Sequence, residues 1–204
     1  MKILMLTDIH SNYDAARLAY KITNPDFVLD CGDHFDLMNL FDFTNHLYVF
    51  GNHEPKSISV KFDSMPLPTQ IFPGVIYNLS KNNDFVKVAG VGGNYSSSDS
   101  LFHVTSENIR LLNFIPQDSI DVLLLHESPY NVDGELKNLA NFMLKEIDRI
   151  KPKFVFCGHV NKYRENYTSQ GVKIMTLDDI STGYSILSVS KKKFNLERVI
   201  SYYK

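Results

Sequence analysis

Residues 2–12 read KILMLTDIHSN, an apolar run that ends in an aspartate and a histidine. A run of roughly four to eight apolar residues bounded by polar ones is typical of a buried strand, here Lys2–Thr7. A helix is predicted next over Tyr13–Ile22, because its apolar residues recur at helical spacing. A second apolar run, Phe27–Cys31, follows. Strand, helix and strand within about 30 residues predict a βαβ unit, in which two parallel strands are joined by a right-handed crossover.

The rest of the chain alternates in the same way. Further strands are expected at Leu47–Phe50, Val75–Leu79, Phe85–Gly90, Ile120–Leu125, Phe154–Cys157, Val172–Thr176, Tyr184–Val189 and Asn195–Ile200. Hairpin turns are expected around residues 81–84 and 191–193. Helices are expected at Thr105–Leu112 and Leu136–Ile150. This alternation predicts a layered α/β protein, with either two sheets between outer helices or one large mixed sheet.

The composition is that of an ordinary globular protein. The chain has 204 residues, of which 44% are hydrophobic and 22% charged, and this excludes disordered, collagen-like and coiled-coil classes. We expect a single domain over residues 1–204, with a small loop and helix insertion around residues 92–118. The formal net charge of −2 gives no sign of a nucleic-acid or membrane partner. The sequence leaves open whether the chain forms a homo-oligomer.

Cysteine content and hydropathy bear on the compartment. Two cysteines, Cys31 and Cys157, are too few for a disulfide framework and are expected as small buried residues at strand ends. No apolar stretch approaches the roughly 18–20 residues that a membrane span needs. The first apolar run is too short for a signal peptide. We therefore expect a soluble, cytoplasmic protein.

Polar residues of a few types gather just past the ends of the predicted strands. They are Asp8, His10, Asp33, Asn52, His53, His126, His159 and Asn161. Ligands of α/β sheets bind outside the carboxyl ends of the strands, so one convergent site is expected. Carboxylate, imidazole and amide donors suit manganese, iron, zinc, nickel or cobalt. Six or seven ligands are too many for one ion that also holds water, and they fit two ions that share a bridging carboxylate.

Each of these residues also has an ordinary interpretation. Asp33 follows a glycine and could be a turn residue, and His126 alone could be a core histidine. The ordered set, rather than any one member, favours a metal site. His46 and His103 fit no motif and are expected as surface or core histidines.

Taken in order, these segments resemble the motifs of the calcineurin-like metallophosphoesterases: Asp8-Ile9-His10, Gly32-Asp33, Gly51-Asn52-His53-Glu54, His126 and Gly158-His159. The resemblance runs from residue 8 to about residue 161. It implies a four-layer α/β/β/α sandwich of two mixed β-sheets flanked by helices. It also implies a dinuclear metal site at the strand ends.

The resemblance assigns a role to each motif residue. The first metal is held by Asp8 and His10, Asp33 bridges both metals, and the second metal is held by Asn52, His126 and His159. His53 is then the catalytic histidine beside the metals. Glu54 either orients a histidine from behind or is an ordinary carboxylate at the start of a helix.

Two positions depart from the family pattern. Asn161 stands where the family has a histidine that binds the first metal. An amide oxygen is a poorer donor than imidazole for these metals, so Asn161 is a weaker ligand and the first site is expected to bind metal less tightly. Ser11 replaces a glycine and affects only the local turn.

The implied activity is hydrolysis of a small phosphoester by a hydroxide that two divalent transition metal ions activate, with manganese as the first candidate. Small members of the family without a large cap resemble phosphodiesterases more than phosphomonoesterases, so a diester or cyclic phosphate is favoured. Candidate substrate contacts are His34, Asn94 and Tyr95 in the Gly92–Ser98 loop, and Tyr130.

Two other functions remain open. Asn161 favours a non-catalytic binding or scaffold module on the same fold, whereas the retained His53 and Asp33 argue for an enzyme. A nuclease would need a nucleic-acid groove, which no basic run or aromatic stripe indicates.

Overall fold

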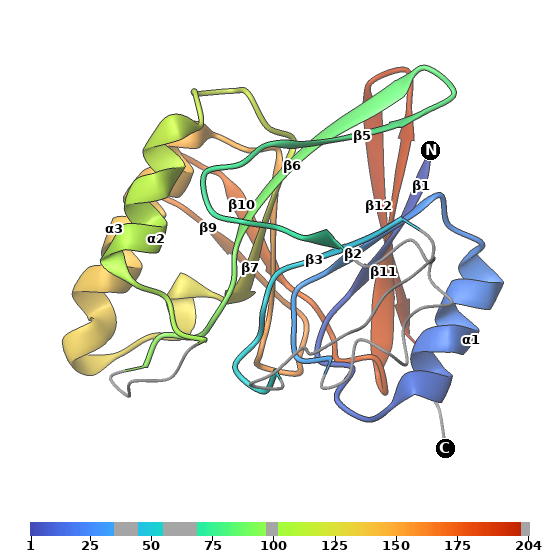
Figure 1. The fold of residues 1–204 in the computed structure, drawn as a ribbon, viewed down its shortest axis with the longest axis horizontal. Coiled ribbons are helices and arrows are strands. Elements are labelled where there is room, and N and C mark those ends of the chain that lie inside the picture. The colour runs from blue at the N-terminus through green and yellow to red at the C-terminus, as the bar shows by residue number, and fades with distance from the viewer. Residues whose placement is uncertain (35–44, 55–68, 97–101, 201–204) are drawn as a thin grey trace, which may run out of the picture.

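The computed structural model of the chain describes residues 1–34, 45–54, 69–96 and 102–200. Two mixed β-sheets of six strands each form the centre, and helices lie on their outer sides (Figure 1). This confirms the sandwich of two mixed sheets flanked by helices, and excludes the alternative of one large sheet.

The first sheet has the strand order β12-β11-β1-β2-β3-β4. Its strands are β1 (Lys2–Leu6), β2 (Phe27–Asp30), β3 (His46–Tyr48), β4 (Thr69–Gln70), β11 (Gly183–Ser190) and β12 (Lys193–Ile200). Strands β1 to β4 run parallel, and β11 is antiparallel to both β1 and β12. The carboxyl ends of β1, β2 and β3 therefore lie at one edge of this sheet.

The second sheet has the strand order β5-β6-β7-β8-β10-β9. Its strands are β5 (Tyr77–Lys81), β6 (Asp84–Val91), β7 (Val122–Glu127), β8 (Phe154–Gly158), β9 (Arg164–Tyr167) and β10 (Lys173–Thr176). The four inner strands are parallel, and β5 and β9 are antiparallel edges. The carboxyl ends of β6, β7 and β8 thus form a second row of strand ends.

Helices cover one side of each sheet. Helix α1 (Tyr13–Thr23) lies beside the first sheet, and α2 (Ser106–Leu111) and α3 (Lys137–Ile150) lie beside the second (Figure 1). Three short 3-10 turns complete the described elements, at Leu112–Phe114, Pro129–Asn131 and Gly134–Leu136. Within the described ranges, no helix is long and apolar enough to cross a bilayer.

The central strands are buried on both faces. In β1, Ile3 and Met5 pack in the core between the two sheets, whereas Leu4 and Leu6 pack in the core under α1. This alternation follows from the two-residue repeat of a strand. A strand that is buried on both faces must be apolar throughout, and this explains why residues 3–6 form an unbroken apolar run.

Two-residue turns close both predicted hairpins. Asn82 and Asn83 join β5 to β6 with φ angles of 51° and 67°, and Lys191 and Lys192 join β11 to β12 with 49° and 64°. Two successive positive φ angles match the twist of antiparallel strands. Asparagine tolerates this conformation better than lysine does.

Candidate metal centre

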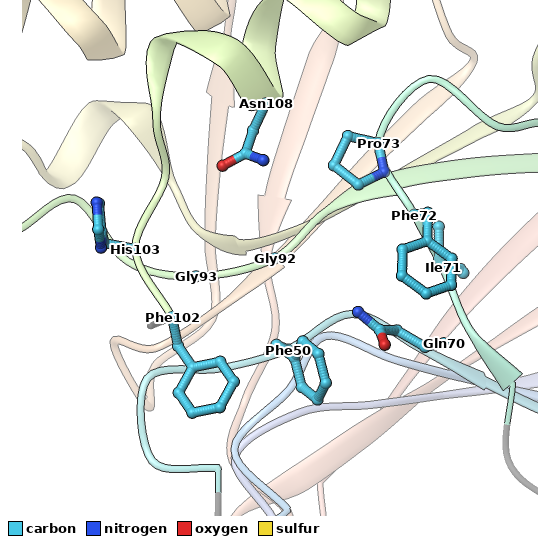
Figure 2. Close-up of a pocket in the computed structure, with 10 residues that line it drawn as sticks. All are labelled: Phe50, Gln70, Ile71, Phe72, Pro73, Gly92, Gly93, Phe102, His103 and Asn108. Carbon is cyan, nitrogen blue, oxygen red and sulfur yellow. The ribbon is translucent and has the colours of Figure 1, made fainter. Parts of the chain in front are cut away.

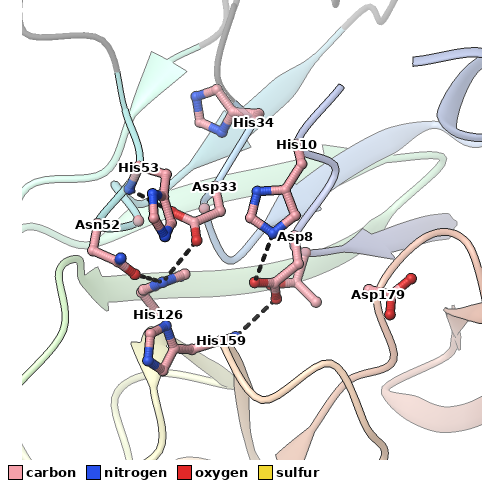
Figure 3. A network of polar contacts seen from close by, with 12 residues as sticks. Asp8, His10, Asp33, His34, Asn52, His53, His126, His159 and Asp179 are labelled. Atoms are coloured by element: carbon pink, nitrogen blue, oxygen red, sulfur yellow. Dashed lines mark hydrogen bonds and ion pairs between the residues drawn. The ribbon is translucent and has the colours of Figure 1, made fainter. Parts of the chain in front are cut away.

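The side chains predicted to bind metal converge where the two rows of strand ends meet (Figure 3). Asp8 and His10 follow β1, and Asp33 follows β2. Asn52 and His53 follow β3. His126 lies near the end of β7, and His159 comes directly after β8. The centre is thus built from strand ends of both sheets.

Asp33 belongs to two sets of potential ligands at once. One set is Asp8, His10 and Asp33, and the other is Asp33, His126 and His159. Within each set, one ligand atom of every residue lies within 4.8 Å of the others. A carboxylate shared by two ligand sets is the arrangement that a two-metal site needs.

The hydrogen bonds of His126 indicate a cation at this point. Its Nδ1 lies 2.7 Å from the carbonyl oxygen of Cys31, which can only accept, so Nδ1 carries the proton. With Nδ1 donating, Nε2 faces Oδ1 of Asn52 at 2.9 Å and Oδ2 of Asp33 at 3.5 Å. A cation among these three atoms could accept electron pairs from all of them. A ligating histidine that donates its other N–H to a carbonyl is also the usual second-shell arrangement of metal sites.

The backbone at the ligands adopts conformations that are uncommon for residues other than glycine. Asp8, His10, Asp33 and His159 have positive φ angles, of 50°, 48°, 62° and 73°, and the exposed Asn161 just beyond them has one of 55°. Such backbone is costly and tends to cluster where function requires it. The turns after β1, β2 and β8 therefore aim their side chains into the centre at the expense of local stability.

Two glycines allow the close approach of these turns. A Cβ atom on Gly51 would lie 2.0 Å from Oδ1 of Asp33, and one on Gly158 would lie 1.8 Å from Oγ1 of Thr7. No side chain fits at either position. Gly51 and Gly158 therefore allow the turns to pack closely against the carboxylates of Asp33 and Asp8.

The burial of Asp8 also favours a bound cation. Burial raises the pKa of Asp8 above its usual value, and hydrogen bonds from the Thr7 hydroxyl and the His159 N–H offset this only in part. Because a nearby positive charge favours the ionised carboxylate, a cation would reverse the shift. The donor set fits two divalent cations, which Asp8, His10 and Asp33 would hold on one side and Asp33, Asn52, His126 and His159 on the other.

His53 differs from the ligands in its exposure. Its backbone N–H donates a 2.8 Å hydrogen bond to Oδ1 of Asp33, while its ring is exposed at the mouth of the centre. The ring centroids of His53 and His10 are 5.8 Å apart. His53 is thus tied through its backbone to the carboxylate that both ligand sets share, and its side chain is exposed.

A buried polar network supports the centre from behind. Oε1 of Glu54 accepts hydrogen bonds from the backbone N–H groups of Asp33 and Gly51 at 2.9 and 3.1 Å. Nδ1 of His34 lies 3.3 Å from the same oxygen. Burial raises the pKa of Glu54 to about 8 and lowers the pKa of His34 to about 4. Glu54 therefore joins the turn after β2 to the turn after β3.

The structure places the expected substrate contacts in different surroundings. The side chains of His34 and Tyr95 are buried, with 0% and 8% exposed, and leave little surface for a substrate. Tyr130 donates its hydroxyl proton to the Tyr167 carbonyl at 2.6 Å and lines a hollow beside α3. Asn94 is half-buried and pairs with His103 in an isolated bridge. Residues 97 and 98 of the expected loop lie outside the described residues.

Asn161 is exposed, just beyond His159. Glu127 was missed by the sequence analysis, although it directly follows His126. Its Oε2 accepts the Tyr95 N–H at 2.6 Å, and its Oε1 lies 3.8 Å from Nε2 of His159. His46 is buried, with Nε2 at 3.3 Å from Oδ2 of Asp30, and both cysteines are buried and free.

Comparison with solved structures shows the same fold in several proteins. The chain is similar to a dimetal phosphatase from Danio rerio, with a TM-score of 0.68 and 12% identity over 98% of this chain and 96% of that one. It is also similar to a phosphatase from Mycoplasma pneumoniae, with a TM-score of 0.55 and 12% identity over 98% and 93%. A third similar structure is GAP50, the anchor in the inner membrane complex of Plasmodium, with a TM-score of 0.63 and 12% identity over 98% and 84%. At such identities the likeness shows the fold alone.

The sequence itself carries the family relationship. No curated protein sequence matches the chain. A sequence profile described as calcineurin-like phosphoesterase matches residues 1–163. The matched segment contains every motif residue from Asp8 to Asn161 and most of both sheets. The chain therefore belongs to the calcineurin-like phosphoesterase family.

Proposed function

We propose that the protein is a metal-dependent phosphoesterase that acts on phosphodiesters in preference to phosphomonoesters. The observation that carries the proposal is the position of Asp33, which belongs to both ligand sets and is tied to the exposed His53. Manganese is the first candidate for the metal, with iron, zinc, nickel or cobalt as alternatives. The substrate is a small phosphoester.

When bound, two divalent cations would lower the pKa of water and neutralise charge on the phosphate oxygens. Asp33 holds the centre of the site, and its Oδ1 fixes the backbone of His53. The His53 ring stabilises the charge that develops on the phosphate or gives a proton to the leaving ester oxygen. Glu54 keeps the turns that carry Asp33 and His53 at a fixed distance.

The preference for diesters has support beside the centre. A pocket begins at Phe50, directly before the Gly51-Asn52-His53 turn. It offers room for a second ester group, which a monoester lacks.

Hydrolysis of two chromogenic esters tests the proposal. With Mn²⁺, we expect turnover of bis-p-nitrophenyl phosphate to exceed that of p-nitrophenyl phosphate, and the Asp33→Asn variant to lose both. A preference for the monoester would overturn the choice of substrate class. Absence of any Mn²⁺-dependent turnover would overturn the enzyme assignment.

One observation favours a non-catalytic binding module as the second candidate. The position of the last family histidine is held by Asn161, which is exposed. Under this alternative the protein would bind at most one metal ion and hydrolyse neither ester. Metal analysis together with the diester assay separates the two functions.

A further inference from the structure

A pocket of about 250 Å³ lies beside the metal centre, between the end of β3, the start of α2 and the segment that follows β4 (Figure 2). Its walls are mainly aromatic and amide side chains, namely Phe50, Gln70, Phe72, Phe102, His103 and Asn108. Gly92 and Gly93 also line it. All of these lining residues lie in the described part of the chain.

The pocket is close enough to the centre for one substrate to occupy both. Phe50 precedes Gly51, and a Cβ atom on Gly51 would lie 2.0 Å from Oδ1 of Asp33. Since consecutive Cα atoms are 3.8 Å apart, the Phe50 Cα lies within roughly 8 Å of that carboxylate. The Gly93 N–H donates a 2.7 Å hydrogen bond to the Phe50 carbonyl and fixes this corner of the pocket.

The aromatic side chains line the pocket with the faces of their rings and do not form a narrow apolar cleft. The rings of Phe50 and Phe102 lie 5.0 Å apart, with an interplanar angle of 53°. Phe72 stands on the other side of the pocket (Figure 2) and is exposed. A flat ring entering from the mouth would meet aromatic side chains on two sides, which is how proteins bind bases without reading their sequence.

Two amides can read the edge of such a ring. The Oδ1 atom of Asn108 accepts hydrogen bonds from the Thr105 backbone and hydroxyl, at 3.0 and 2.8 Å. This fixes the orientation of the amide and leaves Nδ2 as a donor. The Gln70 side chain forms no hydrogen bond within the described residues and offers both a donor and an acceptor. Figure 2 places these two amides on opposite sides of the pocket.

The volume limits the ligand. Sites for drug-sized molecules measure about 300–1,000 Å³, so 250 Å³ suits one ring system. From these observations we propose that the pocket binds a planar heterocycle of the nucleobase type, carried on one ester arm of the substrate. The inference rests on the proposed function and specifies its substrate class as nucleotide phosphodiesters.

Two esters with the same leaving group isolate the pocket's contribution. Thymidine 5′-(p-nitrophenyl phosphate) and methyl p-nitrophenyl phosphate both release p-nitrophenolate when water attacks phosphorus, and they differ only in the nucleoside. We expect kcat/KM with Mn²⁺ to favour the nucleotide ester. Phe102→Ala and Gln70→Ala should each reduce the ratio of the two kcat/KM values by about tenfold, mainly through KM. Phe102→Tyr should restore the ratio, and Phe102→Leu should not.

Phe114→Ala serves as the matched control. Phe114 is 75% exposed and does not line the pocket, so the ratio should keep its wild-type value. If wild type hydrolyses both esters equally, or if the pocket variants leave the ratio unchanged, the inference fails while the proposed function stands.

Equilibrium dialysis with thymidine 5′-monophosphate tests the pocket without turnover. Binding by wild type that Phe102→Ala weakens about tenfold would support the pocket even if neither ester were hydrolysed. In that case the proposed function alone would fail. No measurable binding by wild type, or equal binding by both proteins, would overturn the pocket.

Discussion

The backbone N–H of His159 donates a 2.8 Å hydrogen bond to Oδ2 of Asp8, which lies 151 positions earlier in the chain. Asp8 follows a central strand of the first sheet, and His159 follows a central strand of the second. The two sheets therefore meet at the candidate metal centre. A substitution that breaks this hydrogen bond should therefore lower metal affinity as well as stability.

Replacement of Gly158 by alanine tests this contact. The new Cβ would lie 1.8 Å from Oγ1 of Thr7 and 2.6 Å from Oδ2 of Asp8, so the turn after β8 must move away from β1. We expect a loss of about 1–3 kcal/mol in unfolding free energy and a clear loss of metal affinity, measured by denaturation and by titration with Mn²⁺. Gly171→Ala is the control, because nothing lies within 4 Å of that position, and its φ of 82° means that this variant also loses some stability. It should keep wild-type metal affinity, and equal metal loss in both variants would contradict the account.

His53→Ala separates catalysis from metal binding. The His53 ring is exposed and belongs to neither ligand set, so the variant should fold and retain its metal. Turnover of bis-p-nitrophenyl phosphate should fall by about 10²–10⁴-fold, as expected for the loss of a positioned acid–base group. Steady-state kinetics at saturating Mn²⁺, with metal content measured on the same samples, provides the test. Undiminished kcat would remove His53 from the mechanism.

Asn161→His restores the donor that the family pattern has at this position. Loss of even an outer partner of a metal ligand typically costs about 10–100-fold in affinity, so a direct imidazole should tighten the weaker metal-binding step by roughly tenfold. Calorimetric titration of metal-free protein with Mn²⁺ resolves the two steps. Asn161→Ala should not tighten either step. Identical titrations for wild type and Asn161→His would show that residue 161 takes no part in the site.

The buried carboxylate of Asp30 predicts a dependence of stability on pH. Burial alone would raise the pKa of Asp30, but hydrogen bonding to His46, the charges of His34 and His46, and the Gly32 N–H outweigh it and hold the pKa below 3.8. The unfolded chain therefore binds the proton first as pH falls. The stability that Asp30 contributes is present above about pH 4 and is lost as pH falls through the folded-state pKa.

Asp30→Asn should remove this part of the pH profile. We expect the variant to lose about 1–3 kcal/mol at pH 7, because an amide replaces a charged acceptor inside a buried hydrogen-bond network. Below pH 4 the difference from wild type should shrink. Denaturation in the presence of a chelator, between pH 3 and pH 7, measures both effects. Asp14→Asn changes a fully exposed carboxylate and is the control, and an Asp30→Asn profile parallel to wild type would contradict the assignment.

The sequence predicted the central strands because a strand that is buried on both faces is apolar at every position. Residues 3–6 and 122–125 are apolar without interruption, since alternate residues face different cores. Two edge strands have no such apolar run. Strand β9 reads Arg-Glu-Asn-Tyr over Arg164–Tyr167, and β4 is only two residues long. Both exist because a neighbouring strand offers backbone partners.

The candidate site was predictable in its residue types but not in its surroundings. Strand order brings Asp8, Asp33 and His126 together, and their position at strand ends is visible in the sequence. His34 was expected to touch substrate because it follows Asp33, yet its ring turns inward to Glu54 and Asp30. The pocket at Phe50 was not predicted, because its walls come from segments that only the tertiary fold brings together.

Metal stoichiometry tests the central claim most directly. Wild-type protein and Asp33→Asn are stripped of metal, incubated with Mn²⁺, passed through a desalting column and analysed by mass spectrometry of the metal. Because Asp33 is the one residue shared by both ligand sets, we predict two equivalents of metal per chain for wild type and the loss of both together in the variant. Wild type without bound metal, or an Asp33→Asn variant that keeps both ions, would contradict the account.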